Sequence, residues 1–161
     1  MGTGLVNFIS QYPNLIFSRD LILGENDVAI DVVVEAIIKS DKTELLKRFI
    51  SEYDENGKRE TIGFFLLKAA NIGTPKSVQI IIDEIDELGS FTKLSKFTNK
   101  LGNTALHEAA ISGSKFCEEI MDLLISKESQ LLEIENEDLR TPLHLAAHGV
   151  FQLNTKILIG T

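Results

Sequence analysis

The sequence predicts an all-α fold in which short helix pairs stack side by side in a row, and three observations support this prediction. First, the chain repeats itself: LGNTALHEAAISG at residues 101–113 recurs as LRTPLHLAAHG at 139–149, with equivalent threonines 37 residues apart. Second, weaker copies, FFLLKAANIG at 64–73 and VVVEAIIKSD at 32–41, precede them at similar spacings. Third, each copy spaces its apolar residues along one face of a helix. A repeat period between about 20 and 50 residues is typical of stacked architectures.

The size and composition of the chain fit one globular domain. It has 161 residues, of which 43% are hydrophobic and 25% charged, a balance unlike that of disordered or collagen-like chains. With 16 basic against 24 acidic residues, the formal net charge is −8, which disfavours binding to nucleic-acid phosphates. No stretch approaches the roughly 18 apolar residues that a bilayer span needs. We therefore expect this segment to contact neither nucleic acid nor a membrane directly.

Cys117 is the single cysteine, so packing and not an internal disulfide must hold the fold. Residues 1–18 carry no charge, yet they lack the basic start and the continuous apolar run of a signal segment. These features predict a reducing compartment, and we expect the cytoplasm.

Each of the two strong motifs begins a short helix. A threonine before an apolar segment is a good N-cap, and Pro142 follows the second threonine at the first helical position, where its missing N–H costs nothing. Leu106, Ala109 and Ala110 then fall on one helix face, where the alanines permit close approach of a second helix. Gly113 is expected to end the helix by taking a positive φ.

A second amphipathic helix completes each unit. After residue 113 its apolar residues are Ile120, Met121, Leu123, Leu124 and Ile125. In the earlier copy, the first helix carries Leu66, Leu67, Ala69 and Ala70, and the second helix opens at Pro75 and carries Val78, Ile81, Ile82 and Ile85. Residues 32–39 and 43–52 predict a further pair. Polar or glycine-bearing connectors lie between the pairs, at 53–60, 89–103 and 134–140.

The motifs TALHEAA at 104–110 and TPLHLAA at 141–147 resemble the T-P-L-H-x-A-A signature of ankyrin repeats. The resemblance implies an ankyrin-repeat solenoid, an all-α stack of antiparallel helix pairs whose connectors project as hairpin loops, or fingers. It implies an array over residues 27–161, in units of about 27–59, 60–98, 99–135 and 136–161. Residues 1–26 lie outside it, as an N-terminal segment or cap.

The chain also departs from the regular repeat. Because unit spacings of 40 and 37 exceed the nominal period of about 33, we expect an enlarged finger at 89–103 and an extra turn at 114–117. Leu139 stands at the turn site that Gly102 fills in the preceding unit, a site that usually needs a positive φ. We expect that finger to be re-shaped, or Asp138 to take the strained conformation. The segment after residue 149 is short for a second helix and a cap, which indicates truncation or an unusual end.

We predict no catalytic, cofactor or metal site. The resemblance implies that His107 and His144 are structural, bridging neighbouring backbone and the motif threonine. His144 and His148 share a helix face as zinc ligands do, but no glutamate stands where a metalloprotease places its base. Cys117 has no readable partner base and is predicted to be a small buried hydrophobe. Phosphate-binding glycine motifs are absent.

The acidic run DEIDE at 83–87 is the strongest cluster of like charge in the chain. Carboxylates near a helix C-terminus oppose the macrodipole, so the run is a candidate dock for a basic partner. We favour the alternative, the solvated side of an amphipathic helix.

A stack of helix pairs without a catalytic grouping offers an extended binding surface. The resemblance implies that the partner is another protein of unknown identity, contacted by finger tips and by the concave face of the first helices. The candidate contact residues are Lys100, Leu101, Asn103, Glu108, Ser112, Glu137, Asp138, Leu139, Arg140 and Leu145.

Two other functions fit the same motifs. One is a regulatory or anchoring segment of a longer membrane protein, because ankyrin arrays precede transmembrane helices in some proteins. The other is an effector from a parasite, symbiont or virus that mimics a host regulator.

Overall fold

The computed structural model describes residues 35, 37–39, 43–52, 58–89, 92–148 and 159. Its helices are α5 (Thr43–Glu52), α6 (Lys58–Ile72), α7 (Pro75–Glu87), η1 (Leu94–Lys96), α8 (Ala105–Ile111), α9 (Cys117–Lys127), η2 (Ser129–Glu133) and α10 (Pro142–His148). Residues 35, 37–39 and 159 are also helical. The expected cap at 1–26 falls outside the described residues, as does all of 150–161 except Ile159.

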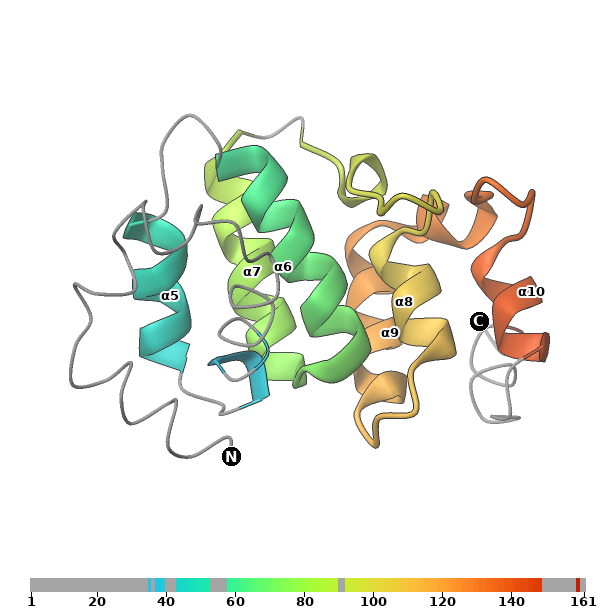
Figure 1. Cartoon of the computed structure of the whole chain (residues 1–161), viewed down its shortest axis with the longest axis horizontal. Helices are drawn as coiled ribbons and strands as arrows, with labels where there is room; N and C mark the ends of the chain where they lie inside the picture. Colours follow the sequence, from blue (N-terminus) through green and yellow to red (C-terminus); the bar gives the residue numbers. More distant parts are fainter. Residues whose placement is uncertain are drawn as a thin grey trace, which may run out of the picture.

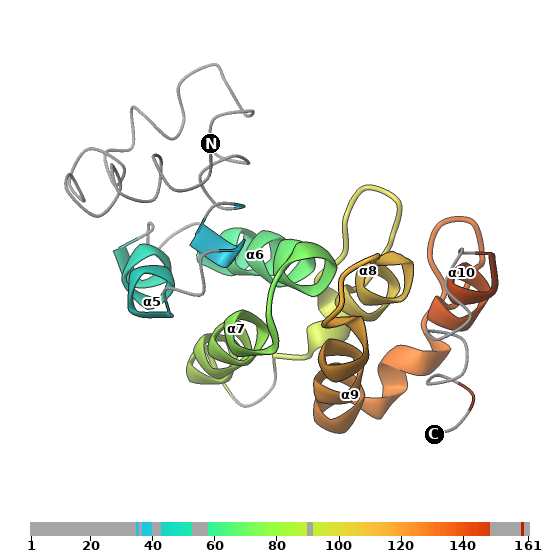
Figure 2. The same cartoon turned by 90° about the horizontal axis from the view of Figure 1, so that it is seen from below.

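The helices form two parallel rows (Figure 1). Seen from below in Figure 2, α6, α8 and α10 make one row, and α7 and α9 make the second. Contacts join α6 to α8 and α8 to α10 within the first row, and α5 to α7 and α7 to α9 within the second. The short connection at residues 73–74 reverses the chain between α6 and α7, so successive helices are antiparallel. The predicted stack of helix pairs is confirmed.

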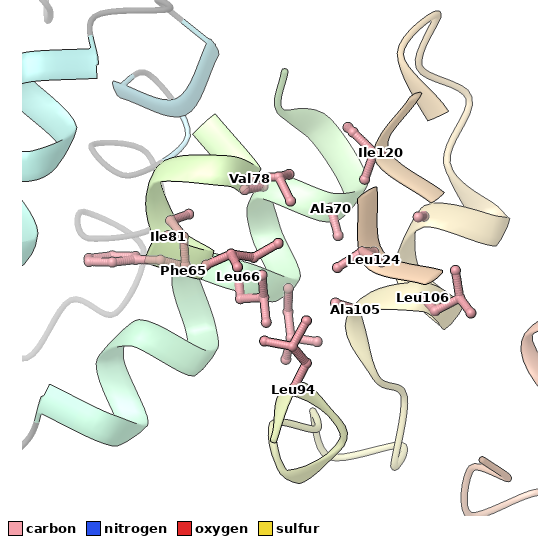
Figure 3. Close-up of a cluster of buried hydrophobic side chains, with 14 of the residues drawn as sticks. Phe65, Leu66, Ala70, Val78, Ile81, Leu94, Ala105, Leu106, Ile120 and Leu124 are labelled. Carbon is pink, nitrogen blue, oxygen red and sulfur yellow. The ribbon is translucent and has the colours of Figure 1, made fainter. Parts of the chain in front are cut away.

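The core lies between the two rows, where side chains from four helices meet (Figure 3). Every member of the predicted apolar stripes of α6 and α7 is at most 9% exposed, and the α8 residues Leu106, Ala109 and Ala110 are at most 1% exposed. Leu94 reaches this core from η1 and ties the base of the long connector to it. Because these buried positions carry alanines, neighbouring helices can approach closely, and a larger side chain there would separate them.

The N-terminus of α7 shows how local sequence fixes a helix start. Thr74 adopts an extended conformation and its Oγ1 accepts the Ser77 N–H at 3.2 Å, while Ser77 Oγ accepts the Thr74 N–H at 3.0 Å. Pro75 follows at the first helical position. This reciprocal capping satisfies donors that a helix start otherwise leaves unpaired.

Three local expectations need correction. Residues 58–60 belong to α6 and not to a connector. Gly113 is not among the described residues with a positive φ. Helix α8 ends at Ile111 because the next residue, Ser112, adopts an extended backbone conformation with φ −66° and ψ 136°. The short 3₁₀ helices η1 and η2 were not predicted, because segments of three and five residues are too short to show a periodic pattern. The extra turn before α9 is confirmed by the bond from the Cys117 N–H to the Ser114 carbonyl, at 3.2 Å.

Candidate functional site

The first finger, residues 97–103, is a tight turn built around Asn99. The Asn99 Oδ1 accepts the N–H groups of Leu101 at 2.9 Å and Asn103 at 3.1 Å. The Gly102 N–H donates to the Asn99 carbonyl at 3.0 Å, with Gly102 at φ +73°. Asparagine folds a turn in this way because its side-chain oxygen imitates a backbone acceptor. The finger tip is therefore held by its own hydrogen bonds.

The second finger, residues 134–140, repeats this turn around Asn136. Its Oδ1 accepts the N–H groups of Asp138 and Arg140, both at 3.0 Å, and its carbonyl accepts the Leu139 N–H at 2.9 Å. Leu139 itself takes φ +59°. The expectation that the finger is re-shaped, or that Asp138 takes the strained conformation, is wrong. The same bonds that place Gly102 in the first turn force Leu139 into the same conformation in the second.

The two fingers are bonded to each other along their length. The Asn136 Nδ2 donates to the buried Asn103 Oδ1 at 2.8 Å, and the Glu137 N–H donates to the Leu101 carbonyl at 2.9 Å. Figure 1 shows both fingers projecting beyond α8 and α10 on the same side of the stack. The second finger is thus fixed relative to the first by bonds between residues more than 30 positions apart.

His107 supplies a third bond between the units. Its Nδ1 lies 3.1 Å from the Thr104 N–H donor and must accept from it, which assigns the proton to Nε2. Nε2 then donates to the Arg140 carbonyl at 2.9 Å. Burial lowers the pKa of His107, while the bond to Arg140 and the charge of Glu108 act in the opposite direction. The structural role expected for His107 is confirmed.

His144 makes the equivalent bonds to Thr141 in α10, at 3.0 Å to the backbone nitrogen and 3.1 Å to the hydroxyl, but it is exposed. Cys117 is buried as predicted, and burial raises the pKa of its thiol. Of the acidic run, Asp83, Glu84, Asp86 and Glu87 lie on the accessible side of α7.

The residues predicted to contact a partner divide into three groups. Lys100, Leu101, Glu137, Asp138, Leu139 and Arg140 are exposed on the fingers. Leu145 and Glu108 are half-buried on the inner helices. Asn103 and Ser112 are 4% and 2% exposed, which corrects the expectation for them. Their side chains bond within the array, where the Ser112 hydroxyl donates to the Asn71 carbonyl, and so are not available to a partner.

Glu108 is also engaged inside the molecule. Its Oε1 accepts the side-chain N–H groups of Asn99 at 2.9 Å and Asn103 at 3.1 Å, and its Oε2 accepts that of Asn71 at 3.1 Å. Three amide donors thus hold one carboxylate between α6, α8 and the first finger. Glu108 positions the finger beside the helices as well as facing the inner surface.

A groove beside the first finger was not predicted. Its larger part, with a volume of about 570 Å³, is lined by α6 and by residues 96–100, including Phe64, Leu67 and Phe97. A smaller part of about 320 Å³ adjoins it and extends toward Lys68 and Glu108. The repeat alignment gave one indication of this groove. Lys68, before Ala69, aligns with Glu108, before Ala109, so the two groove residues occupy equivalent positions of their repeats. The apolar floor of the groove depends on how the finger packs against α6, so no local sequence pattern predicts it.

A family model for ankyrin repeats (3 copies) matches residues 66–159. The chain belongs to the ankyrin-repeat family. This agrees with the two rows of helices, the paired fingers and the threonine–histidine bonds at the start of α8 and α10. Comparison with curated proteins gives no match, and comparison with solved structures gives none.

Among the residues described in this ankyrin array, no group of histidine, cysteine and acidic side chains is placed to hold a metal ion. Within the same residues, no helix combines the length and apolar character of a membrane span. Ankyrin repeats are in general protein–protein interaction modules and are typically non-catalytic.

Proposed function

We propose that this ankyrin array binds a partner protein through its two finger tips and the adjoining face of the inner helices. The observation that carries the proposal is the pair Leu101 and Leu139, exposed at 61% and 72% on fingers that hydrogen bonds hold in place. An apolar side chain on a preorganised loop is a favourable binding anchor, because little conformational entropy is lost when a partner covers it. A single cysteine supports a reducing compartment such as the cytoplasm.

The backbone at Leu139 gives independent support. A leucine at φ +59° is strained, whereas the equivalent turn of the first finger has a glycine. The chain therefore keeps a large apolar side chain where both backbone strain and solvent exposure oppose it. Strained residues that persist in a structure tend to cluster at functional sites.

Affinity capture tests this proposal with the double variant Leu101→Ser and Leu139→Gly. We expect the wild-type chain to recover a specific partner and the double variant to lose it, because the partner's apolar pocket is left unfilled. Ile111→Ser is the matched control, since Ile111 is an exposed apolar residue at the far end of α8, away from the fingers. Equal recovery by wild type and double variant would count against the proposal, provided that circular dichroism shows all three chains folded.

A further inference from the structure

The groove beside the first finger joins an apolar floor to a basic rim. Phe64 and Leu67 of α6 form the floor together with Phe97 of the finger. Phe97 packs directly over Gly63, where a Cβ atom would lie 2.5 Å from the Phe97 ring. This close approach sets the depth of the groove. Pockets of several hundred Å³ with mainly apolar walls are typical of ligand-binding sites.

Three lysines surround this floor. Lys96 at the end of η1 and Lys100 in the finger turn are exposed and line the larger part, and no ion pair involves either of them among the described residues. Lys68 lines the smaller part, and its Nζ lies 5.7 Å from the centre of the Phe64 ring. These three positive charges therefore lie next to the apolar floor.

The opposing charge in the groove is small. Glu108 is the one carboxylate among the described residues that line the groove, and three side-chain amides donate to its oxygens. Lys96 and Lys100 face this one engaged carboxylate, so their part of the groove is locally positive on a chain whose net charge is −8. Such a local reversal of sign steers oppositely charged ligands and disfavours basic ones.

We propose that this groove binds an acidic peptide segment of the partner protein, one that carries a large apolar side chain between its carboxylates. The apolar side chain enters the floor formed by Phe64, Leu67 and Phe97, and the carboxylates pair with Lys96 and Lys100. This inference rests on the proposed function and adds the chemistry of the partner. It also gives a role to the lysines beside this apolar floor on a chain whose net charge is −8.

Peptide display tests the inference with a random library of roughly 12-residue peptides selected on the full chain. We expect enrichment of sequences that combine Asp or Glu with Leu or Phe. Fluorescence anisotropy should show about tenfold weaker binding of these peptides to the double variant Lys96→Glu and Lys100→Glu, because two ion pairs become two repulsions. Binding to the wild type should also weaken as the salt concentration rises, because salt screens exposed charges.

The control is the double variant Lys47→Glu and Lys76→Glu, which reverses two exposed lysines on α5 and α7, away from the groove. Its affinity should equal that of the wild type. Enrichment of basic or uncharged peptides, no enrichment at all, or equal binding by both double variants would overturn the inference. So would sedimentation showing that a second copy of the chain occupies the groove and that reversal of Lys96 and Lys100 dissociates the pair.

The two proposals can fail separately. If partner capture is lost with Leu101→Ser and Leu139→Gly but retained with Lys96→Glu and Lys100→Glu, the binding module stands and the groove assignment falls. If both sets of variants capture the partner as the wild type does, both assignments fall.

Discussion

At the scale of single residues, Leu139 shows how a turn can override the preference of a side chain. Asn136 fixes the turn through two bonds from its Oδ1 and one to its carbonyl, and these bonds decide the backbone conformation of every residue between them. A left-handed conformation costs a residue other than glycine about 1–2 kcal/mol. The turn is stable enough to impose that cost on leucine.

Replacing Leu139 with glycine should therefore stabilise the fold while removing a contact residue. We expect Leu139→Gly to raise the free energy of unfolding by about 1 kcal/mol, because glycine adopts a positive φ without steric strain. Urea unfolding followed by circular dichroism measures this change. Asp138→Gly is the control, since Asp138 has no positive φ and its replacement should bring no gain. Equal stabilisation by both variants would contradict the assignment of strain to Leu139.

His107 makes the stability of the fold depend on pH. Burial holds its pKa below the ordinary value of 6.5, so the folded chain keeps the imidazole neutral. As the pH falls below about 6.5, the unfolded chain binds a proton that the folded chain does not, and the free energy of unfolding falls. We expect this histidine to contribute a loss of at most about 1.4 kcal/mol per pH unit, continuing until the pH reaches the folded-state pKa.

Urea unfolding of wild type and His107→Gln between about pH 7.5 and 5.5 checks this prediction. The variant should be less stable at neutral pH, because the bonds to Thr104 and Arg140 are disturbed, but its stability should depend less on pH. An NMR titration of His107 in the wild type gives a second measurement, with protonation expected only below pH 6.5. Parallel pH profiles of the two chains, or protonation of His107 above that pH, would contradict the prediction.

At the scale of structural elements, the fingers act as one unit because their backbones touch. Gly102 has φ +73°, and a Cβ atom there would lie 2.8 Å from the Glu137 nitrogen, which donates to the Leu101 carbonyl. Glycine is thus required at position 102 for two reasons: it adopts the positive φ of the turn, and it has no Cβ atom that would clash with the backbone of the second finger. This explains why the first finger has no side chain at the site where the second has Leu139.

Substitution of Gly102 should separate the fingers. We expect Gly102→Ala to lower the free energy of unfolding by about 1–3 kcal/mol, from backbone strain and from the clash with Glu137. Hydrogen exchange of the Glu137 and Leu139 amides should become faster in the folded state. Gly113→Ala is the control: Gly113 is exposed and has no positive φ, so its replacement should change stability by less than about 0.5 kcal/mol. Unchanged exchange at Glu137 in the Gly102 variant would show that the fingers are not coupled.

At the scale of the whole molecule, small residues set the spacing of the stack. Ala69, Ala70, Ala109, Ala110 and Ala146 are all at most 1% exposed, so they lie inside the stack. Neighbouring units touch only each other in such an array, and each interface contributes separately to stability. The spacing at one interface therefore affects the register of the fingers above it.

Enlarging one of these alanines should loosen the stack. Ala110→Leu is expected to lower the free energy of unfolding by about 1–3 kcal/mol, because the buried site has no room for the extra carbons. Ala147 occupies the equivalent position of α10 but is exposed, so Ala147→Leu should change stability by less than about 0.5 kcal/mol. Thermal and urea unfolding of the two variants decide the comparison. Similar losses at both positions would show that the tight spacing lies elsewhere.

Local patterns in the sequence determined the elements of this protein. The threonine caps, the proline starts and the alanine stripes predicted helices in order, because each depends on residues within about four positions of one another. Their recurrence predicted the stack, and the ankyrin motif correctly assigned His107 a structural role. The resemblance to ankyrin repeats also pointed to the finger tips, which the structure shows to be exposed.

The tertiary structure alone decided how the units are joined and what lies between them. The bonds from His107 to Arg140 and from Asn136 to Asn103, and the packing of Phe97 on Gly63, connect residues more than 30 positions apart. No local pattern encodes them, because they depend on how neighbouring units dock. For the same reason the burial of Asn103 and the groove could not be predicted. The repeat alignment marked position 139 as a site that needs a positive φ, but only the structure showed that Leu139 itself adopts it, because the bonds of Asn136 fix the turn.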